Sequence, residues 1–150
     1  YQNIKNVGIL ATDKVVQSNI YEKLIISKYQ VKTFSLALSE LVSLVENNDQ
    51  VLIDKFLEDN LTLLVGKIDV LILACTHFNI IEENINRIFK GKIPIICSGY
   101  SLINRLKNNL LCLSCCREKI YLTNFNEDYV KKIHNLFNEL KNIEIKSLNI

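Results

Sequence analysis

Residues 68–79 read IDVLILACTHFN, a mainly apolar run followed at once by a thiol, a hydroxyl and an imidazole. A short apolar run rich in β-branched residues is typical of a strand that is buried in a parallel sheet. A second run, VGILA at 7–11, leads directly into Thr12 and Asp13. Ligands of open parallel sheets bind beyond the carboxyl ends of the strands, so both polar stretches mark a candidate site.

Strand and helix patterns alternate along the rest of the chain. This alternation predicts an α/β fold with a mostly parallel sheet that is flanked by helices on both faces. The length of 150 residues fits one ordinary domain. Strands are predicted over 7–11, 29–35, 68–74, 93–97, 118–123 and 143–148, and helices over 14–27, 38–47, 50–66, 79–89, 101–109 and 126–140.

Composition excludes several classes of partner and location. The formal net charge is only +2 and no basic stripe is visible, so nucleic acid is not an implied partner. No apolar run is long enough for a membrane span, and the start of the chain lacks a signal-peptide pattern. The chain has five cysteines, an odd number, and is not small and loop-rich, which favours a reducing cytoplasm over a secreted disulfide framework.

Cys75, Thr76 and His77 form the most reactive stretch of the sequence. The thiolate is the reactive form of cysteine, and the N-terminus of the helix predicted over 79–89 would favour it. His77 could donate a hydrogen bond or relay a proton, and Thr76 could hold a substrate carboxylate. A structural alternative stays open: a lone cysteine is often a small buried hydrophobe, and a threonine at a helix start is often only a cap.

LILACTHFN at 71–79 resembles the LGCTHYP signature of glutamate racemases, which belong to the aspartate/glutamate racemase superfamily. A histidine in third place points to the glutamate branch, since aspartate racemases usually carry glutamate there. Four other segments resemble the same family in the same order, so the resemblance covers nearly the whole chain. They are 7–21, 40–47, 93–106 and 120–137.

The resemblance implies inversion of glutamate at the α-carbon without metal, pyridoxal phosphate or any other cofactor. One thiolate removes the α-proton, and a second cysteine returns a proton from the opposite face. Cys75 matches the second catalytic cysteine, His77 the histidine that assists it, and Thr76 a substrate-contacting threonine. The implied role is the supply of D-glutamate for bacterial peptidoglycan.

Three further positions match residues around the family's active site. Thr12 and Ser18 match residues of the first motif that help to bind the amino acid. Glu46 matches an acidic residue at the rim, and a solvated carboxylate at a helix end is an equally good reading. The sequence departs from the family where Val15 replaces a second threonine and Cys97 replaces an aspartate.

The family carries its first catalytic cysteine in a region that precedes the part matching Tyr1. That region is not among these residues and the chain contains no methionine, so we expect a C-terminal half. Because this half lacks the acid on the opposite face of the substrate, we expect that it does not racemise efficiently alone. Residues 1–97 would form one lobe, and residues 98–150 would return to the other lobe. The implied partners are glutamate and either a second copy in a homodimer or a complementing N-terminal half.

Other readings of the sequence remain. The chain could be a non-catalytic remnant or an amino-acid-binding module, which the Val15 and Cys97 departures favour. An aspartate or hydantoin racemase is disfavoured by His77. The CLSCC stretch at 112–116 is interpreted as a thiol cluster rather than a metal site, because zinc usually takes four ligands and no second pair is visible. His134 is expected to be solvated.

Overall fold

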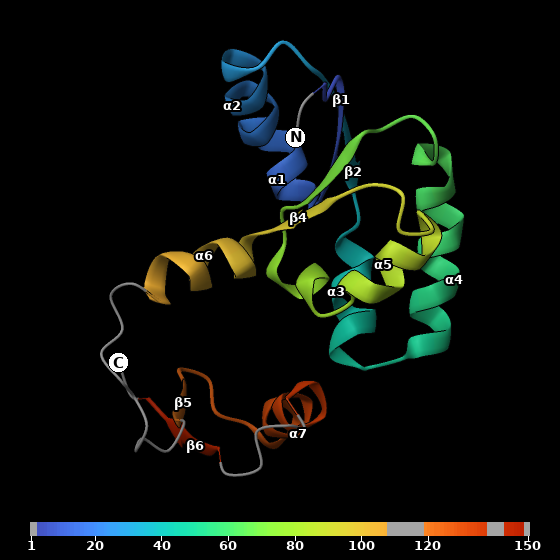
Figure 1. Cartoon of the computed structure of the whole chain (residues 1–150). Helices are drawn as coiled ribbons and strands as arrows, with labels where there is room; N and C mark the ends of the chain where they lie inside the picture. The colour runs from blue at the N-terminus through green and yellow to red at the C-terminus, as the bar shows by residue number, and fades with distance from the viewer. Residues whose placement is uncertain (1–2, 108–118, 138–142, 149–150) are drawn as a thin grey trace.

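The computed structural model describes residues 3–107, 119–137 and 143–148. Figure 1 shows the chain as one larger α/β unit, followed by α6 and a smaller group of elements near the C-terminus. The predicted α/β fold with a mostly parallel sheet is confirmed.

The main sheet has four strands, all parallel, in the order β2-β1-β3-β4. A second sheet pairs β5 with β6, also in parallel. The strands are β1 (Asn6–Ala11), β2 (Lys32–Ala37), β3 (Val70–Leu73), β4 (Ile95–Cys97), β5 (Lys119–Leu122) and β6 (Glu144–Ser147).

Helices connect the strands of the main sheet, as parallel pairing requires. The α-helices are α1 (Asp13–Ser18), α2 (Ile20–Lys28), α3 (Ser39–Glu46), α4 (Gln50–Leu61), α5 (Glu82–Ile88), α6 (Ser98–Lys107) and α7 (Glu127–Leu136), and two 3₁₀ turns are η1 (Thr62–Leu64) and η2 (Thr76–Asn79).

Several predicted elements have different limits in the structure. The strand expected over 29–35 is Lys32–Ala37, and the helix expected from residue 101 begins at Ser98. Three other helices also differ. The helix expected over 14–27 is two helices, because Asn19 adopts a left-handed conformation with φ of 53° between them. The helix expected over 50–66 ends at Leu61 and continues only as η1. The helix expected over 79–89 begins at Glu82, since residues 76–79 form η2 instead.

One face of the main sheet is covered by three helices, most completely over its central strands. Helices α3, α4 and α5 lie together on this side (Figure 1). Their apolar side chains, among them Leu41, Leu57 and Ile85, pack with Leu10 and Leu71 of the sheet in a single buried cluster. Each of these five side chains is fully buried, so this face supplies most of the hydrophobic core.

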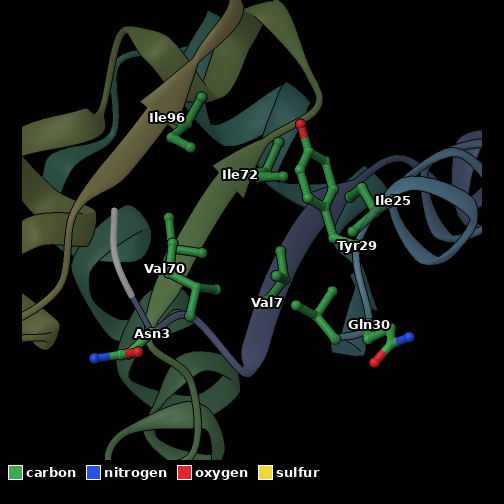
Figure 2. A pocket seen from close by; sticks show the side chains of 10 residues that line it. Asn3, Val7, Ile25, Tyr29, Gln30, Val70, Ile72 and Ile96 are labelled. Atoms are coloured by element: carbon green, nitrogen blue, oxygen red, sulfur yellow. The ribbon is translucent and has the colours of Figure 1, made fainter.

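The other face is covered only in part, by α1 and α2 (Figure 1). An apolar hollow of about 490 Å³ remains there between the strands and the end of α2. Figure 2 shows Ile25 and Tyr29 on one side of it, facing Val7 and Ile72 of the strands. Helices therefore flank both faces, as predicted, and the second face keeps this apolar hollow among the described residues.

The carboxyl ends of β1, β2 and β3 meet at one edge of the sheet. The Ala74 N–H donates to the Leu10 carbonyl at 2.8 Å, and the Leu38 N–H donates to the Ala11 carbonyl at 2.8 Å. Thr12 and Cys75, which follow these strands, therefore lie at the same edge, as the sequence predicts.

The C-terminal elements contact this edge through α7. Helix α6 leads away from the sheet, and β5, β6 and α7 lie beyond it (Figure 1). Lys132 of α7 pairs with Glu46 at the end of α3, and Leu136 packs against the main core. The CLSCC stretch at 112–116 lies outside the described residues, and so does its interpretation as a thiol cluster.

A side chain at Gly8 in β1 would displace the ends of two core side chains. A Cβ there would lie 2.7 Å from Ile68 Cδ1 and 2.9 Å from Leu71 Cδ1, both of them in the core. We expect Gly8→Ala to lower the free energy of unfolding by roughly 1–3 kcal/mol, measured by urea denaturation.

Gly99→Ala in α6 is the matched control, because a Cβ there meets only the flexible amide of Asn79, at 3.2 Å. It should be neutral or slightly stabilising, since alanine favours a helix over glycine. Equal losses of stability in the two variants would contradict this account of Gly8.

Candidate active site

Cys75 lies at the carboxyl end of the central strand β3, one residue beyond Ala74. Its backbone is extended, with φ of −139° and ψ of 135°, and it immediately precedes η2. Phe78 fixes this turn, because its side chain is fully buried in the core and its N–H donates to the Cys75 carbonyl at 3.2 Å. The expected position of Cys75 at the start of an α-helix is wrong, since α5 begins only at Glu82.

The sulfur of Cys75 faces the ring of His77. Cys75 Sγ lies 4.0 Å from His77 Nδ1, and both side chains are half-buried. The other ring nitrogen, Nε2, lies 3.3 Å from Glu46 Oε1. A neutral imidazole that donates from Nε2 has its lone pair on Nδ1. In the tautomer with its proton on Nε2, facing Glu46, His77 could accept a proton from the thiol of Cys75 through Nδ1.

Glu46 is the last residue of α3 and is held from two sides. Its Oε2 accepts a hydrogen bond from Lys132 Nζ at 2.8 Å, while Oε1 faces His77. The hydrogen bond and charge of Lys132, helped by His77, hold the pKa of Glu46 below its ordinary value although burial opposes this. The same pairing raises the pKa of Lys132. Glu46 is thus a bound carboxylate beside the imidazole, and not one that is merely solvated.

The two threonines singled out in the sequence lie at the same edge of the sheet. Thr12 is half-buried at the start of α1, where its side chain makes no capping hydrogen bond. Thr76 is the first residue of η2 and is exposed. Hydroxyl groups at these positions could bind the charged groups of an amino acid.

Ser18 lies at the other end of α1 from Thr12. Its hydroxyl donates to the Val15 carbonyl at 2.7 Å and accepts from the Ile20 N–H at 3.3 Å. These bonds hold the break between α1 and α2, so the hydroxyl already has a structural task. The structure does not bring Ser18 together with Cys75 and His77. Val15 packs against a second, smaller core cluster, whose buried residues are Val7, Ile9, Ala11 and Val70. An apolar residue is therefore accepted at this position.

Cys97 ends β4, opposite Leu73 of β3. Only 5% of its surface is exposed, and it packs in the main core as a small hydrophobe. Next to it, Asn79 donates from Nδ2 to Ser98 Oγ at 3.5 Å, and its buried Oδ1 has no hydrogen-bond partner in the part of the chain that the structure describes.

Three further findings concern metal ligands, membrane spans and His134. Within 3–107, 119–137 and 143–148, no three His, Cys, Asp or Glu side chains cluster closely enough to hold a metal ion. None of the helices over these ranges combines the length and apolarity that a membrane span needs. His134 is exposed on α7, as predicted.

Lys132, which pairs with Glu46 beside His77, is a residue of the candidate site that the sequence did not identify. It lies 86 residues from Glu46, and a lysine on the polar side of an amphipathic helix carries no sign of such a contact. The hollow on the second face is a separate feature, since its apolar lining includes neither Cys75 nor His77.

No family model matches the chain. A glutamate racemase of Streptococcus uberis is 29% identical over 143 residues, which are 89% of this chain and 54% of that protein. A glutamate racemase of Streptococcus mutans is 36% identical over 96 residues, which are 62% of this chain and 36% of that protein. The chain therefore spans about half the length of the curated relatives it matches, or less.

Solved structures show the same similarity in the fold. A glutamate racemase isoform of Bacillus anthracis has a TM-score of 0.75 at 22% identity, over 97% of this chain and 57% of its own. A Francisella tularensis glutamate racemase in complex with D-glutamate scores 0.76 at 22% identity, over 97% and 58%. An aspartate racemase of Picrophilus torridus scores 0.59 at 27% identity, over 71% and 46%. The resemblance to glutamate racemases seen in the sequence is thus confirmed.

The burial of Phe78 predicts a large loss of stability on truncation. We expect Phe78→Ala to lower the free energy of unfolding by about 3–5 kcal/mol in urea denaturation. Ile80→Ala, two residues on and 46% exposed, should change it by no more than about 0.5 kcal/mol. Similar losses in both variants would show that Phe78 does not anchor the turn.

The lowered pKa of Glu46 predicts a pH-dependent contribution to stability. A carboxyl group whose folded pKa lies below its ordinary 4.5 stabilises the fold above that pH, and the contribution disappears as the pH falls through the folded pKa. Thermal melts from about pH 7 to about pH 3 should therefore show wild type and Glu46→Gln converging in acid.

Glu40→Gln provides the control for this comparison. Glu40 lies in the first turn of the same helix and is exposed, so its replacement changes the net charge equally. Its melting temperature should keep a small and constant offset from wild type. If the difference in melting temperature between wild type and Glu46→Gln were equally constant with pH, it would contradict the lowered pKa of Glu46 in the folded protein.

Proposed function

We propose that this chain carries one of the two proton-transfer faces of a glutamate racemase. The full reaction would be cofactor-independent inversion of L- and D-glutamate, supplying D-glutamate for peptidoglycan in the cytoplasm. The observation that carries the proposal is the row Cys75–His77–Glu46, in which Sγ lies 4.0 Å from Nδ1 and Nε2 lies 3.3 Å from Oε1. The similarity to glutamate racemases supports it.

The proposed chemistry moves two protons in turn. The thiol of Cys75 gives its proton to His77 Nδ1, and Glu46 stabilises the imidazolium that forms. The resulting thiolate takes the α-proton of glutamate, so the C–H bond breaks and an S–H bond forms. The electron pair left behind is delocalised into the α-carboxylate, which Thr76 and Thr12 would hold by hydrogen bonds.

Inversion needs a second acid on the opposite face of the substrate. We propose that this is a cysteine from an N-terminal half of the protein, supplied on the same polypeptide or by complementation. Residues 1–97 would then be one lobe and residues 98–150 part of the other. Homodimer formation is a further part of this proposal.

A second candidate is an amino-acid-binding module without catalysis. It is favoured by Ser18, whose hydroxyl is engaged within its own helix, and by Cys97, which is buried rather than presented to a ligand. Such a module would bind glutamate but would leave its α-proton in place. Proton exchange therefore separates the two candidates.

The test is the exchange of the α-proton of glutamate in deuterated water, followed by proton NMR. A base on a single face exchanges the α-proton of one enantiomer and returns deuterium to the same face. The chain incubated separately with L- and D-glutamate should exchange one of them and produce no inversion. Addition of an N-terminal half of a glutamate racemase should convert this exchange into racemisation.

Cys75→Ser should abolish the exchange, because a hydroxyl is far harder to ionise than a thiol near neutral pH. Cys97→Ala should retain it, since Cys97 is a core residue in the proposed assignment. Exchange that persists in Cys75→Ser, or that is absent even with an N-terminal half present, would rule out the proposed function. Binding of glutamate without exchange would establish the second candidate.

A further inference from the structure

Lys132 lies on α7, which follows the last strand of the main sheet in sequence. Its ammonium group nevertheless lies 2.8 Å from Oε2 of Glu46, the carboxylate beside His77. We propose that Lys132 is a positioning residue of the Cys75 site and acts through Glu46. Its significance for catalysis rests on the proposed function, but its effect on His77 is measurable without any substrate.

Each oxygen of the Glu46 carboxylate has a separate partner. Oε2 accepts from Lys132 at 2.8 Å, a short charge-assisted bond, while Oε1 faces His77 Nε2 at 3.3 Å. The terminal torsion of a glutamate is soft, so a carboxylate with one partner can rotate and exchange that partner for water. With Lys132 on one oxygen, the plane of the carboxylate is fixed and the other oxygen stays on the imidazole.

Lys132 is itself held in place, unlike an ordinary surface lysine. Its ammonium lies 5.9 Å from the centre of the Tyr129 ring. The start of α7 is capped by the Asn126 side chain, which accepts from the Tyr129 N–H at 2.9 Å. Leu136 at the other end of the helix packs against the main core. The cation therefore reaches Glu46 from a helix that is capped at its start and packed against the core near its end.

The neighbouring lysine on the same helix provides a contrast. The side chain of Lys131 is 71% exposed, and its ammonium lies 3.9 Å from Asp128 of its own helix. The side chain of Lys132 is 35% exposed and bonds across the structure. Lys131→Gln and Lys132→Gln remove the same charge from adjacent positions, so any difference between them reports the contact with Glu46.

The orientation of His77 is the property that Lys132 controls. When Nε2–H is held by Glu46, the lone pair of Nδ1 is directed at the Cys75 sulfur, 4.0 Å away. When the carboxylate rotates, the ring loses this restraint and the thiol loses its proton acceptor. Placement of α7 against α3 would thus decide whether Cys75 is reactive.

The experiment is NMR of the imidazole groups after uniform ¹⁵N labelling, without substrate. The chain has two histidines, so His134, which is exposed on α7, serves as the internal reference. We expect a ring Nε2–H signal of His77 that is protected from exchange with water. It should disappear in Lys132→Gln, persist in Lys131→Gln and return in Lys132→Arg.

A second readout is the rate at which iodoacetamide alkylates Cys75 at neutral pH, measured by mass spectrometry of its peptide. The rate should fall about fivefold in Lys132→Gln, which corresponds to roughly 1 kcal/mol, and should be unchanged in Lys131→Gln. An unchanged methyl spectrum and His134 signal would show that the fold is intact.

Wild-type values of both readouts in Lys132→Gln, or equal changes in Lys131→Gln, would overturn the inference. Loss in Lys132→Arg as complete as in Lys132→Gln would also overturn it, since a cation would then not be the determinant. If the His77 signal depends on Lys132 while glutamate exchange is absent, the positioning role stands and the proposed function fails. If glutamate exchange occurs but the His77 signal is unchanged in Lys132→Gln, the proposed function stands and the positioning role fails.

Discussion

Parallel pairing of β3 between β1 and β4 is the constraint on which the candidate site depends. The carboxyl ends of parallel neighbours must lie at one edge, so the residues that follow β1 and β3 are brought together whatever their distance in sequence. The apolar side chains of β3 leave the strand no alternative position, because Leu71 and Leu73 are buried in the main core. The position of Cys75 at this edge consequently depends on the burial of β3 side chains and not on a polar contact of Cys75 itself. Phe78 completes the arrangement by tying the next turn to the same core.

Polar contacts then decide what the delivered thiol faces. The link from Lys132 through Glu46 and His77 to Cys75 contains half-buried groups, so no single contact in it stabilises the fold strongly. Its value is directional: each group fixes the orientation of the next one. Such a series of contacts is sensitive to the loss of any one of its residues. It also connects α7 to the end of β3, which is distant from α7 in sequence.

The sequence predicts the parallel main sheet and the position of Cys75, Thr76 and His77 just beyond the end of one of its strands. The segments VGILA at 7–11 and IDVLILA at 68–74 are mainly apolar because both faces of their strands are covered at least in part. Such a pattern can be recognised from neighbouring residues alone. Helix limits were less predictable: Asn19 adopts a left-handed conformation that the periodicity around it does not reveal, and the start of α5 depends on where Phe78 finds the core. Lys132 could not have been found, because its contact with Glu46 depends on the placement of a whole helix. The internal hydrogen bonds of Ser18 were equally invisible, since a family motif records a residue type and not its partners.

The all-parallel main sheet also has a consequence for how this chain reaches its native state. At the amino ends of β1 and β3, the Asp69 carboxylate accepts from the Lys5 N–H, 64 positions away, so joining the two central strands closes a very long loop. None of the four strands can begin as a hairpin, which is the fast local route to a sheet. Folding of this unit should therefore be slow and governed by topology, with exposed strands waiting for their partners during synthesis. The order of the strands therefore makes aggregation of the partly folded chain a hazard.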